Sequence, residues 1–168
     1  TGIYITIGTG VGVGIFVNRK LLHGMLHPEG GHILLERGTN DSYKGCCPYH
    51  ANCLEGLASG PALEGRYGKK AIELKDMPDV WELEAEYIAK ALVNYILILS
   101  PERIVLGGGV MHQEQLFPLI RKKTAEFLNG YVDTKQLHDL GSYIVPPSLN
   151  DNQGILGCIK LAWDALHN

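Results

Sequence analysis

The chain has 168 residues, of which 45% are hydrophobic and 20% are charged, as in an ordinary soluble globular domain. Its net charge of −3 argues against nucleic-acid binding, which needs a broad basic surface to neutralise phosphates. The longest apolar run, residues 89–99, contains Lys90 and Asn94 and is too short to cross a bilayer. We therefore expect one compact domain that contacts neither nucleic acid nor membrane.

The beginning of the chain predicts an antiparallel β-meander. Strands are expected over residues 2–7 and 11–17, which are rich in isoleucine, valine and threonine, with a glycine-containing break over residues 8–10 between them. A turn over residues 18–20 then leads into a third strand that starts at residues 21–22.

Residues 23–53 predict a long irregular loop, because glycine, histidine and proline recur along them. Loops of that length usually need a reason to be ordered, and a bound metal would supply one.

The rest of the chain predicts helices that alternate with short strands. Helices are expected over residues 54–58, 61–67, 80–99, 114–128 and 153–166, and strands over residues 103–106 and 143–145. In the longest helix, Ile88, Leu92 and Tyr95 stack on one face. A β-meander followed by this alternation predicts an α/β domain with a mixed sheet.

Glycine occupies every second position from Gly8 to Gly14. The motif is not a P-loop, because no Gly-Lys-Ser/Thr follows, and Val13 and Ile15 occupy the places where a dinucleotide motif would have its third glycine. In a strand these glycines would share one bare face, where a phosphate can approach the backbone and the hydroxyl of Thr9. A tight hairpin that needs glycine for steric reasons is an equal alternative.

A second glycine run, Gly107-Gly108-Gly109, follows the strand expected over residues 103–106. Open α/β sheets bind ligands at the carboxyl ends of their strands. A plain strand-to-helix turn would normally need one glycine, so three favour a ligand that lies on the backbone.

The spacing Cys47-x-x-His50-x-x-Cys53 can turn three metal ligands inward from one short loop. His32 would close a tetrahedron of nitrogen and sulfur ligands, as in a structural zinc site. This arrangement favours metal binding over a disulfide framework, and with it a cytoplasmic location. The alternative is a set of buried, unliganded cysteines beside an incidental histidine.

The other two cysteines are expected outside the metal site. Cys46 is interpreted as a spare thiol, although the sequence leaves open whether Cys46 replaces Cys47 as a ligand. Cys158 falls on the apolar face of the last predicted helix and is expected in the core.

Two glutamates accompany these ligands, Glu29 and Glu55. If His32 binds a metal through one ring nitrogen, its other N–H is left to donate to a substrate hydroxyl. Carboxylates that accept from hydroxyls beside such an imidazole form a plausible site for a polyol or sugar. The alternative is that both glutamates lie on the surface or cap nearby helices.

Together these motifs resemble the ROK family (repressors, open reading frames and sugar kinases). The resemblance runs from Thr1 nearly to the C-terminus and rests on the order of Gly8-Thr9-Gly10-x-Gly-x-Gly, Glu29-x-x-His32, the cysteine cluster ending in Cys53-x-Glu55, Ser59-Gly60, and Gly107-Gly108-Gly109. The form Cys47-Pro48-Tyr49-His50-x-x-Cys53 resembles the bacterial fructokinase branch. It departs from the Cys-x-Cys-Gly pair more common in the family, because His50 takes the place of a cysteine.

The resemblance implies an actin-like ATPase fold (ribonuclease H-like) of two lobes that close on ATP and a sugar. By it, Glu29, His32 and Glu55 contact sugar hydroxyls. His32, Cys47, His50 and Cys53 bind a structural Zn²⁺. The ATP phosphates lie against Gly8, Thr9 and Gly10, and the adenosine lies near Gly107, Gly108 and Gly109.

The resemblance also points to residues outside this chain. The family's general base is an aspartate in a Gly-x-Asp-type segment of the first lobe, and the aspartates here, Asp41 among them, lie away from any such motif. The chain begins at Thr1 without methionine. We therefore expect residues 1–168 to form a C-terminal lobe, with a zinc loop at about residues 32–53 and no catalytic residue of its own.

The expected activity is phosphorylation of a hexose by ATP and Mg²⁺, with D-fructose converted to fructose 6-phosphate, and the isolated lobe is expected to be inactive. Alternatives are a mannose or glucose kinase, the sugar-sensing effector domain of a transcriptional repressor, and an inactive zinc-stabilised interaction domain. A homodimer is expected from the family, since many members are dimers.

Overall fold

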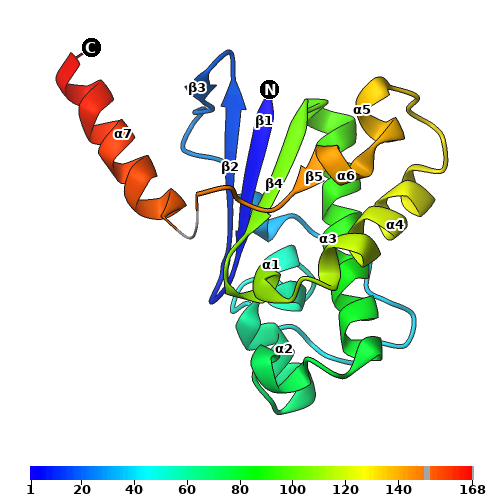
Figure 1. Cartoon of the computed structure of the whole chain (residues 1–168). Coiled ribbons are helices and arrows are strands. Elements are labelled where there is room, and N and C mark those ends of the chain that lie inside the picture. The colour runs from blue at the N-terminus through cyan, green and yellow to red at the C-terminus, as the bar shows by residue number, and fades with distance from the viewer. Residues whose placement is uncertain (150–151, 168) are drawn as a thin grey trace.

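The computed structural model describes residues 1–149 and 152–167 and contains a five-stranded sheet in the order β3-β2-β1-β4-β5 (Figure 1). The strands are β1 Gly2–Ile7, β2 Val11–Val17, β3 Lys20–Leu21, β4 Arg103–Gly107 and β5 Ile144–Val145. β2 runs antiparallel to both β1 and β3, whereas β4 is parallel to both β1 and β5. The predicted meander and mixed sheet are therefore confirmed.

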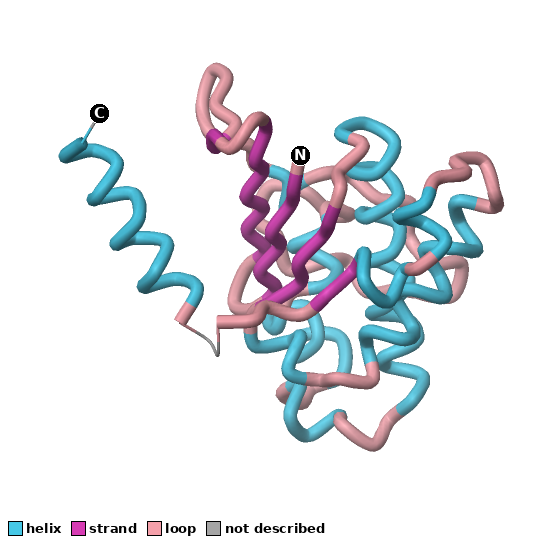
Figure 2. The backbone as a smooth tube through the Cα atoms, turned by 45° about the horizontal axis from the view of Figure 1, so that its top comes forward, coloured by secondary structure: helices cyan, strands magenta, loops and turns pink. Residues whose placement is uncertain are grey.

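Alternation along β1 sets which face of the sheet is covered. Ile3, Ile5 and Ile7 are buried while the residues between them are partly exposed, as period-2 geometry requires. They share one hydrophobic core with Ile104 and Leu106 of β4 and with the long helix α3, Pro78–Leu99. After β3 the chain leaves the sheet, passes through α3 and returns as β4. β4 lies beside β1 and is parallel to it, and Figure 2 shows the strands side by side.

The described residues contain seven α-helices, which are α1 Leu54–Ala58, α2 Gly60–Tyr67, α3, α4 Leu116–Leu128, α5 Lys135–His138, α6 Leu140–Tyr143 and α7 Gln153–His167. All five predicted helices are present. Pro78 starts α3 two residues before the predicted beginning, since proline is favoured in a first turn. The short helices α5 and α6 were not predicted, and Tyr143, expected in a strand, ends α6 instead. None of the helices combines the length and hydropathy that crossing a bilayer would require, within the described residues.

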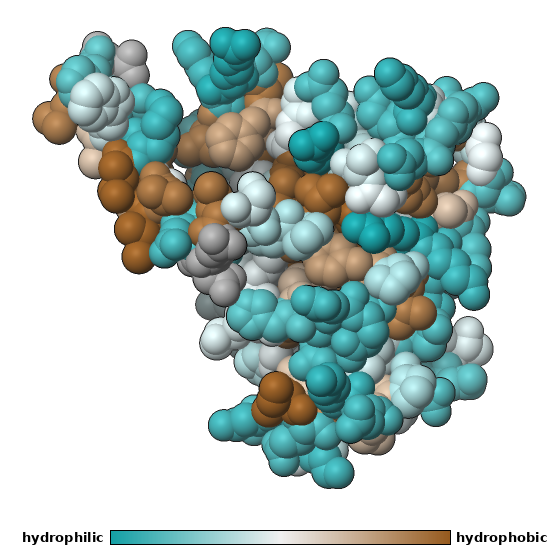
Figure 3. All heavy atoms as spheres, viewed as in Figure 1, coloured by the Kyte–Doolittle hydropathy of each residue, from teal (hydrophilic) through white to brown (hydrophobic). Residues whose placement is uncertain are grey.

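The last helix, α7, differs from the prediction in its packing. No residue of α7 is buried within the described part of the chain, and Ile155, Ile159 and Trp163 are exposed. Figure 1 shows α7 apart from the sheet, and Figure 3 shows hydrophobic side chains along it. The expected core position of Cys158 is wrong, because this cysteine is exposed. Helical periodicity reveals an apolar face, but not what covers that face.

A buried ionic cluster, which we call the Asp41 cluster (Asp41, Tyr43, Arg66 and Tyr87), ties the long loop to α2 and α3. The side chains of Asp41 and Arg66 are only 4% and 7% exposed, and their ion pair is 3.2 Å long. Tyr87 donates to Asp41 at 2.6 Å, and Arg66 lies over the Tyr43 ring at 4.8 Å. Burial alone would raise the pKa of Asp41, but the hydrogen bonds from Tyr87 and the Tyr43 N–H, with the charge of Arg66, hold it below its usual value.

Candidate functional site

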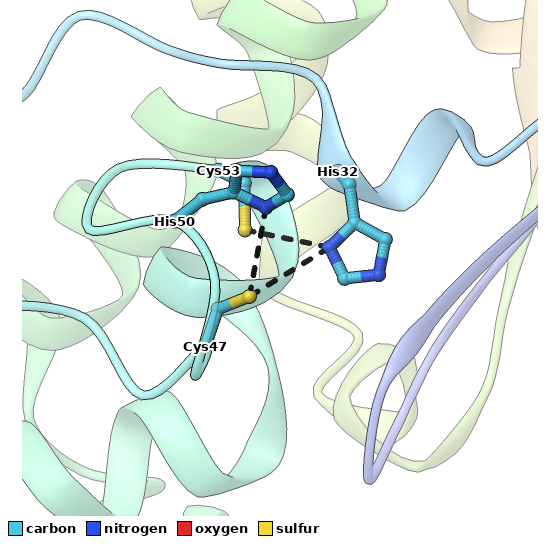
Figure 4. Close-up of side chains that lie close together, drawn as sticks. All are labelled: His32, Cys47, His50 and Cys53. Atoms are coloured by element: carbon cyan, nitrogen blue, oxygen red, sulfur yellow. Dashed lines mark hydrogen bonds between the residues drawn. The ribbon is translucent and has the colours of Figure 1, made fainter.

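Four side chains that lie apart in the sequence converge in one cluster. The ligand atoms of His32, Cys47, His50 and Cys53, which we call the metal cluster, all lie within 4.8 Å of one another (Figure 4). The Nδ1 atom of His32 lies 3.8 Å from the Cys47 sulfur and 3.6 Å from the Cys53 sulfur. The Cys47 sulfur lies 3.7 Å from Nδ1 of His50.

These separations fit a tetrahedral zinc ion. With Zn–S near 2.3 Å and Zn–N near 2.0–2.1 Å, tetrahedral angles place sulfur and nitrogen about 3.6 Å apart. Two thiolates and two neutral imidazoles also balance the charge of Zn²⁺. The donor set and the spacing of these residues therefore fit a structural zinc site.

Hydrogen bonds of the backbone, of the Cys53 sulfur and of the Arg37 side chain hold the ligand-bearing segments in place. Cys53 caps the start of α1, and its sulfur accepts a hydrogen bond from the Gly56 N–H at 3.3 Å. Cys53 also forms an antiparallel bridge with Leu34, two residues after His32. Arg37 donates to the carbonyls of Tyr43 and Ala51 and so closes the segment that carries Cys47 and His50.

The protonation of Cys53 depends on what occupies the cluster. Burial, together with the neighbouring Cys47 and Glu55, raises the pKa of Cys53 to about 11, although the hydrogen bond from Gly56 works against this. Such a thiol stays protonated at neutral pH unless a cation takes the place of its proton.

Cys46 points out of the metal cluster. It is exposed, and its sulfur lies 3.5 Å from the Ser59 hydroxyl and 3.8 Å from the carbonyl oxygen of Glu55. This placement favours Cys47 as the ligand and Cys46 as the spare thiol.

The second ring nitrogen of His32 faces away from the other three ligands (Figure 4). It lies 3.8 Å from Oε1 of Glu55, and both side chains are partly exposed, at 29% and 25%. The other oxygen of Glu55, Oε2, accepts a hydrogen bond of 2.9 Å from the backbone N–H of Val11. His32 and Glu55 therefore form an accessible donor–acceptor pair beside the metal cluster.

Glu29 is not brought into this pair. Its carboxylate lies 2.8 Å from Nε2 of His27, and both side chains are more than half exposed. His32 ends a short 3₁₀ helix, Gly30–His32, which we call the His32 turn. The backbone carbonyl of Glu29 accepts a hydrogen bond of 3.0 Å from the His32 N–H, so Glu29 lies directly before this turn.

The glycine run splits into two parts. Gly8–Gly10, which we call the glycine turn, joins β1 to β2, and only Gly12 and Gly14 lie within β2. The predicted single glycine face from Gly8 to Gly14 is therefore wrong, because the chain reverses before the strand begins. The turn is closed by a hydrogen bond from the Gly8 N–H to the Gly10 carbonyl at 2.9 Å.

The second glycine run lies beside the first. β1 and β4 are parallel neighbours, and a Cβ atom on Gly8 would lie 3.8 Å from the backbone nitrogen of Gly109. Gly108 has φ +93°, and a Cβ there would lie 2.4 Å from the Ile7 carbonyl, so glycine is required sterically. For Gly108, the steric requirement of a strand-to-helix turn is therefore enough to explain the glycine, as the alternative interpretation held.

A cavity of about 680 Å³ opens next to this run. It is lined by Gly107 and Gly108 but not by Gly109, and it includes Glu114, Phe117 and residues 146–147. Glu114, Phe117 and residues 146–147 were not predicted at this site from the sequence. Residues 146–147 could have been found, because they directly follow β5 at the same carboxyl edge of the sheet as Gly107.

The chain is similar to a known protein family and to proteins from several bacteria. The ROK family profile matches residues 1–165. A relative from Bacillus subtilis (strain 168) is 54% identical over 98% of this chain and 55% of its own length. A Pediococcus pentosaceus protein named fructokinase is 48% identical over 99% of this chain and 57% of its own. The chain thus spans little more than half the length of these relatives.

A solved structure shares the fold. The ROK family glucokinase from Streptomyces griseus, in complex with glucose and AMPPNP, superimposes with a TM-score of 0.71 at 25% identity. The likeness covers 95% of this chain and 59% of that one. The α/β architecture predicted from the sequence is therefore that of the ROK sugar kinases, the actin-like ATPase fold.

Proposed function

Because the chain belongs to the ROK family, we propose that it is the C-terminal lobe of an ATP-dependent hexose kinase that converts D-fructose to fructose 6-phosphate. The observation that carries the proposal is the double use of His32. Its Nδ1 joins the metal cluster, while its Nε2 lies 3.8 Å from Glu55 Oε1. The relative named fructokinase, similar over nearly the whole chain, supports fructose as the sugar.

The pair of His32 and Glu55 suits a sugar hydroxyl. A hydroxyl oxygen can lie about 2.8 Å from both atoms, accepting from the imidazole N–H and donating to the carboxylate. Glu29, at the edge of the same turn, would accept from a second hydroxyl once its carboxylate leaves His27. Zinc held by His32, Cys47, His50 and Cys53 would fix the tautomer and orientation of His32.

The nucleotide would lie along the carboxyl edge of the sheet. Gly8, Thr9 and Gly10 would lie against its phosphates, with Mg²⁺ accompanying them. The donors would be the N–H groups of Thr9 and Gly10 and the Thr9 hydroxyl, because the Gly8 N–H already donates to the Gly10 carbonyl. The cavity beside Gly107 and Gly108 has a volume suited to a nucleoside, and Gly109, the next residue, would lie near the adenosine.

Proton removal from the sugar hydroxyl would come from an aspartate outside this chain. The residues here bind and orient both substrates, which is most of what phosphoryl transfer requires of a protein. The proposal places the full-length protein in the cytoplasm as a homodimer, with ATP and a hexose as ligands and no nucleic-acid partner.

The test is an ATP-coupled assay of the full-length protein across fructose, mannose and glucose. We expect the highest kcat/KM with fructose, and no turnover by the 168-residue chain alone. Turnover by this chain alone would show that the base lies within it. Hexose binding by the full-length protein without turnover would favour a sugar-sensing effector domain, and binding of neither hexose nor nucleotide an interaction domain.

A further inference from the structure

We propose that Glu55 couples hexose binding to ATP binding, because its carboxylate joins the sugar site to the glycine turn. Glu55 is then a positioning residue for the phosphoryl donor as well as a sugar ligand. This inference rests on the proposed function.

The two oxygens of Glu55 face two different parts of the site. Oε1 lies 3.8 Å from Nε2 of His32, on the side where the hexose would bind. Oε2 accepts from the N–H of Val11 at 2.9 Å, and Val11 is the first residue of β2, directly after the glycine turn. A Cβ atom on Gly10 would lie 2.7 Å from Oε2, so the carboxylate lies against the turn itself.

The helix that carries Glu55 is also tied to the glycine turn through its backbone. The Ser59 N–H donates to the Glu55 carbonyl at 3.2 Å and ends α1. The next residue, Gly60, donates its N–H to the Gly8 carbonyl at 2.7 Å. The glycine turn is thus held at Gly8 by a backbone hydrogen bond and directly after the turn, at Val11, by the Glu55 side chain, which also reaches the sugar side.

A bound hexose would order this link. A hydroxyl that donates to Oε1 fixes the rotamer of Glu55 and keeps Oε2 on the Val11 N–H. It also displaces water from a side chain that is 25% exposed, which strengthens the remaining hydrogen bond. ATP then binds a turn that is already ordered, and by thermodynamic linkage ATP must tighten hexose binding by the same factor.

Only a carboxylate can serve both sides. Glutamine has the same shape but one acceptor oxygen and one donor group, so it can accept from Val11 or from the hexose but not from both. The substitution Glu55→Gln therefore breaks the link with little change in volume. The matched control is Glu29→Gln, since Glu29 is the other proposed sugar carboxylate and its own carboxylate pairs with His27.

A second variant breaks the link from the other end. Val11→Pro removes the N–H that Oε2 accepts, at the first residue of a strand, where proline is tolerated. It leaves both oxygens of Glu55 free for the hexose. This variant tests the proposal even if Glu55→Gln loses hexose affinity altogether.

The experiment measures the dissociation constant of AMPPNP with Mg²⁺, by calorimetry on the full-length protein, with and without saturating fructose. We expect fructose to tighten AMPPNP binding about fivefold or more in the natural protein and in Glu29→Gln. In Glu55→Gln and Val11→Pro the factor should fall below about twofold, while Val11→Pro keeps its fructose affinity within about threefold.

The proposal is overturned if fructose has no effect on AMPPNP binding in the natural protein, or if Val11→Pro keeps the full factor. Failure of the proposed function looks different, because the natural protein would then bind no hexose, or would bind hexose without turning it over in the ATP-coupled assay. Zinc content, measured on every variant, shows whether the metal cluster is intact in each comparison.

Discussion

A Gly31→Ala substitution should lower kcat/KM for the hexose about 100-fold in the full-length protein, because displacing a binding group by about 1 Å can have that effect. A Cβ atom on Gly31 would lie 1.9 Å from the Val11 carbonyl oxygen and 2.9 Å from its carbon. Both are backbone atoms of β2 and cannot rotate aside. The His32 turn would have to move away from the strand, and His32 would move with it.

Gly24→Ala is the matched control for this prediction. Gly24 belongs to the same long loop and is exposed, and no atom lies within 4 Å of where its Cβ would be. It should leave kcat/KM unchanged. A Gly31→Ala protein with natural kcat/KM and zinc content would contradict the claim that close contact with β2 positions His32.

An Asp41→Ala substitution should lower the free energy of unfolding by about 3–5 kcal/mol, the usual effect of leaving one partner of a buried ion pair unpaired. Arg66, whose side chain is 7% exposed, would lose its carboxylate, and the Tyr87 hydroxyl would lose its acceptor. Urea unfolding of this chain in zinc-containing buffer measures the change.

Two further variants make the Asp41 result specific. Asp41→Asn keeps an acceptor for Tyr87 and should cost less than Asp41→Ala. Asp133→Ala removes an exposed partner of His138 and should leave the free energy nearly unchanged. A change below about 1 kcal/mol for Asp41→Ala would show that the cluster does not hold the loop.

Acid should weaken the same cluster. The pKa of Asp41 is lower in the folded chain than its ordinary value of 3.8. Its contribution to stability is therefore complete above that value and is lost as the pH falls through the lower, folded-state pKa.

The local patterns of the sequence predicted local structure well. Alternation in residues 2–7 predicted β1, and helical periodicity predicted α3. The spacing of Cys47, His50 and Cys53 predicted a cluster with His32 as its fourth member, and the structure brings these four side chains together. Each of these signals lies within a few residues, where backbone geometry alone determines which side chains share a face.

What the sequence could not show depends on contacts between distant segments. Cys158 was placed in the core because α7 has an apolar face, yet nothing in the described residues buries that helix. Asp41 belongs to no recognisable motif, and its role depends on Arg66 of α2 and Tyr87 of α3, which lie far from it in the sequence. The direction of the Glu29 carboxylate, toward His27, likewise depends on loop conformation.

In the proposed function, the metal cluster organises the sugar site through His32. The most direct test is the dissociation constant of fructose for the full-length protein, measured by calorimetry with zinc bound, after chelation, and after zinc is restored. Circular dichroism should accompany each state, so that loss of binding is separated from unfolding.

We expect the chelated, still folded protein to bind fructose at least about tenfold more weakly, the scale on which lost support of a binding group acts, and restored zinc to recover the affinity. Cys46→Ser should bind zinc and fructose as the natural protein does, whereas Cys53→Ser should lose both. Unchanged fructose affinity in the chelated, folded protein would contradict the claim that zinc positions His32 for the sugar.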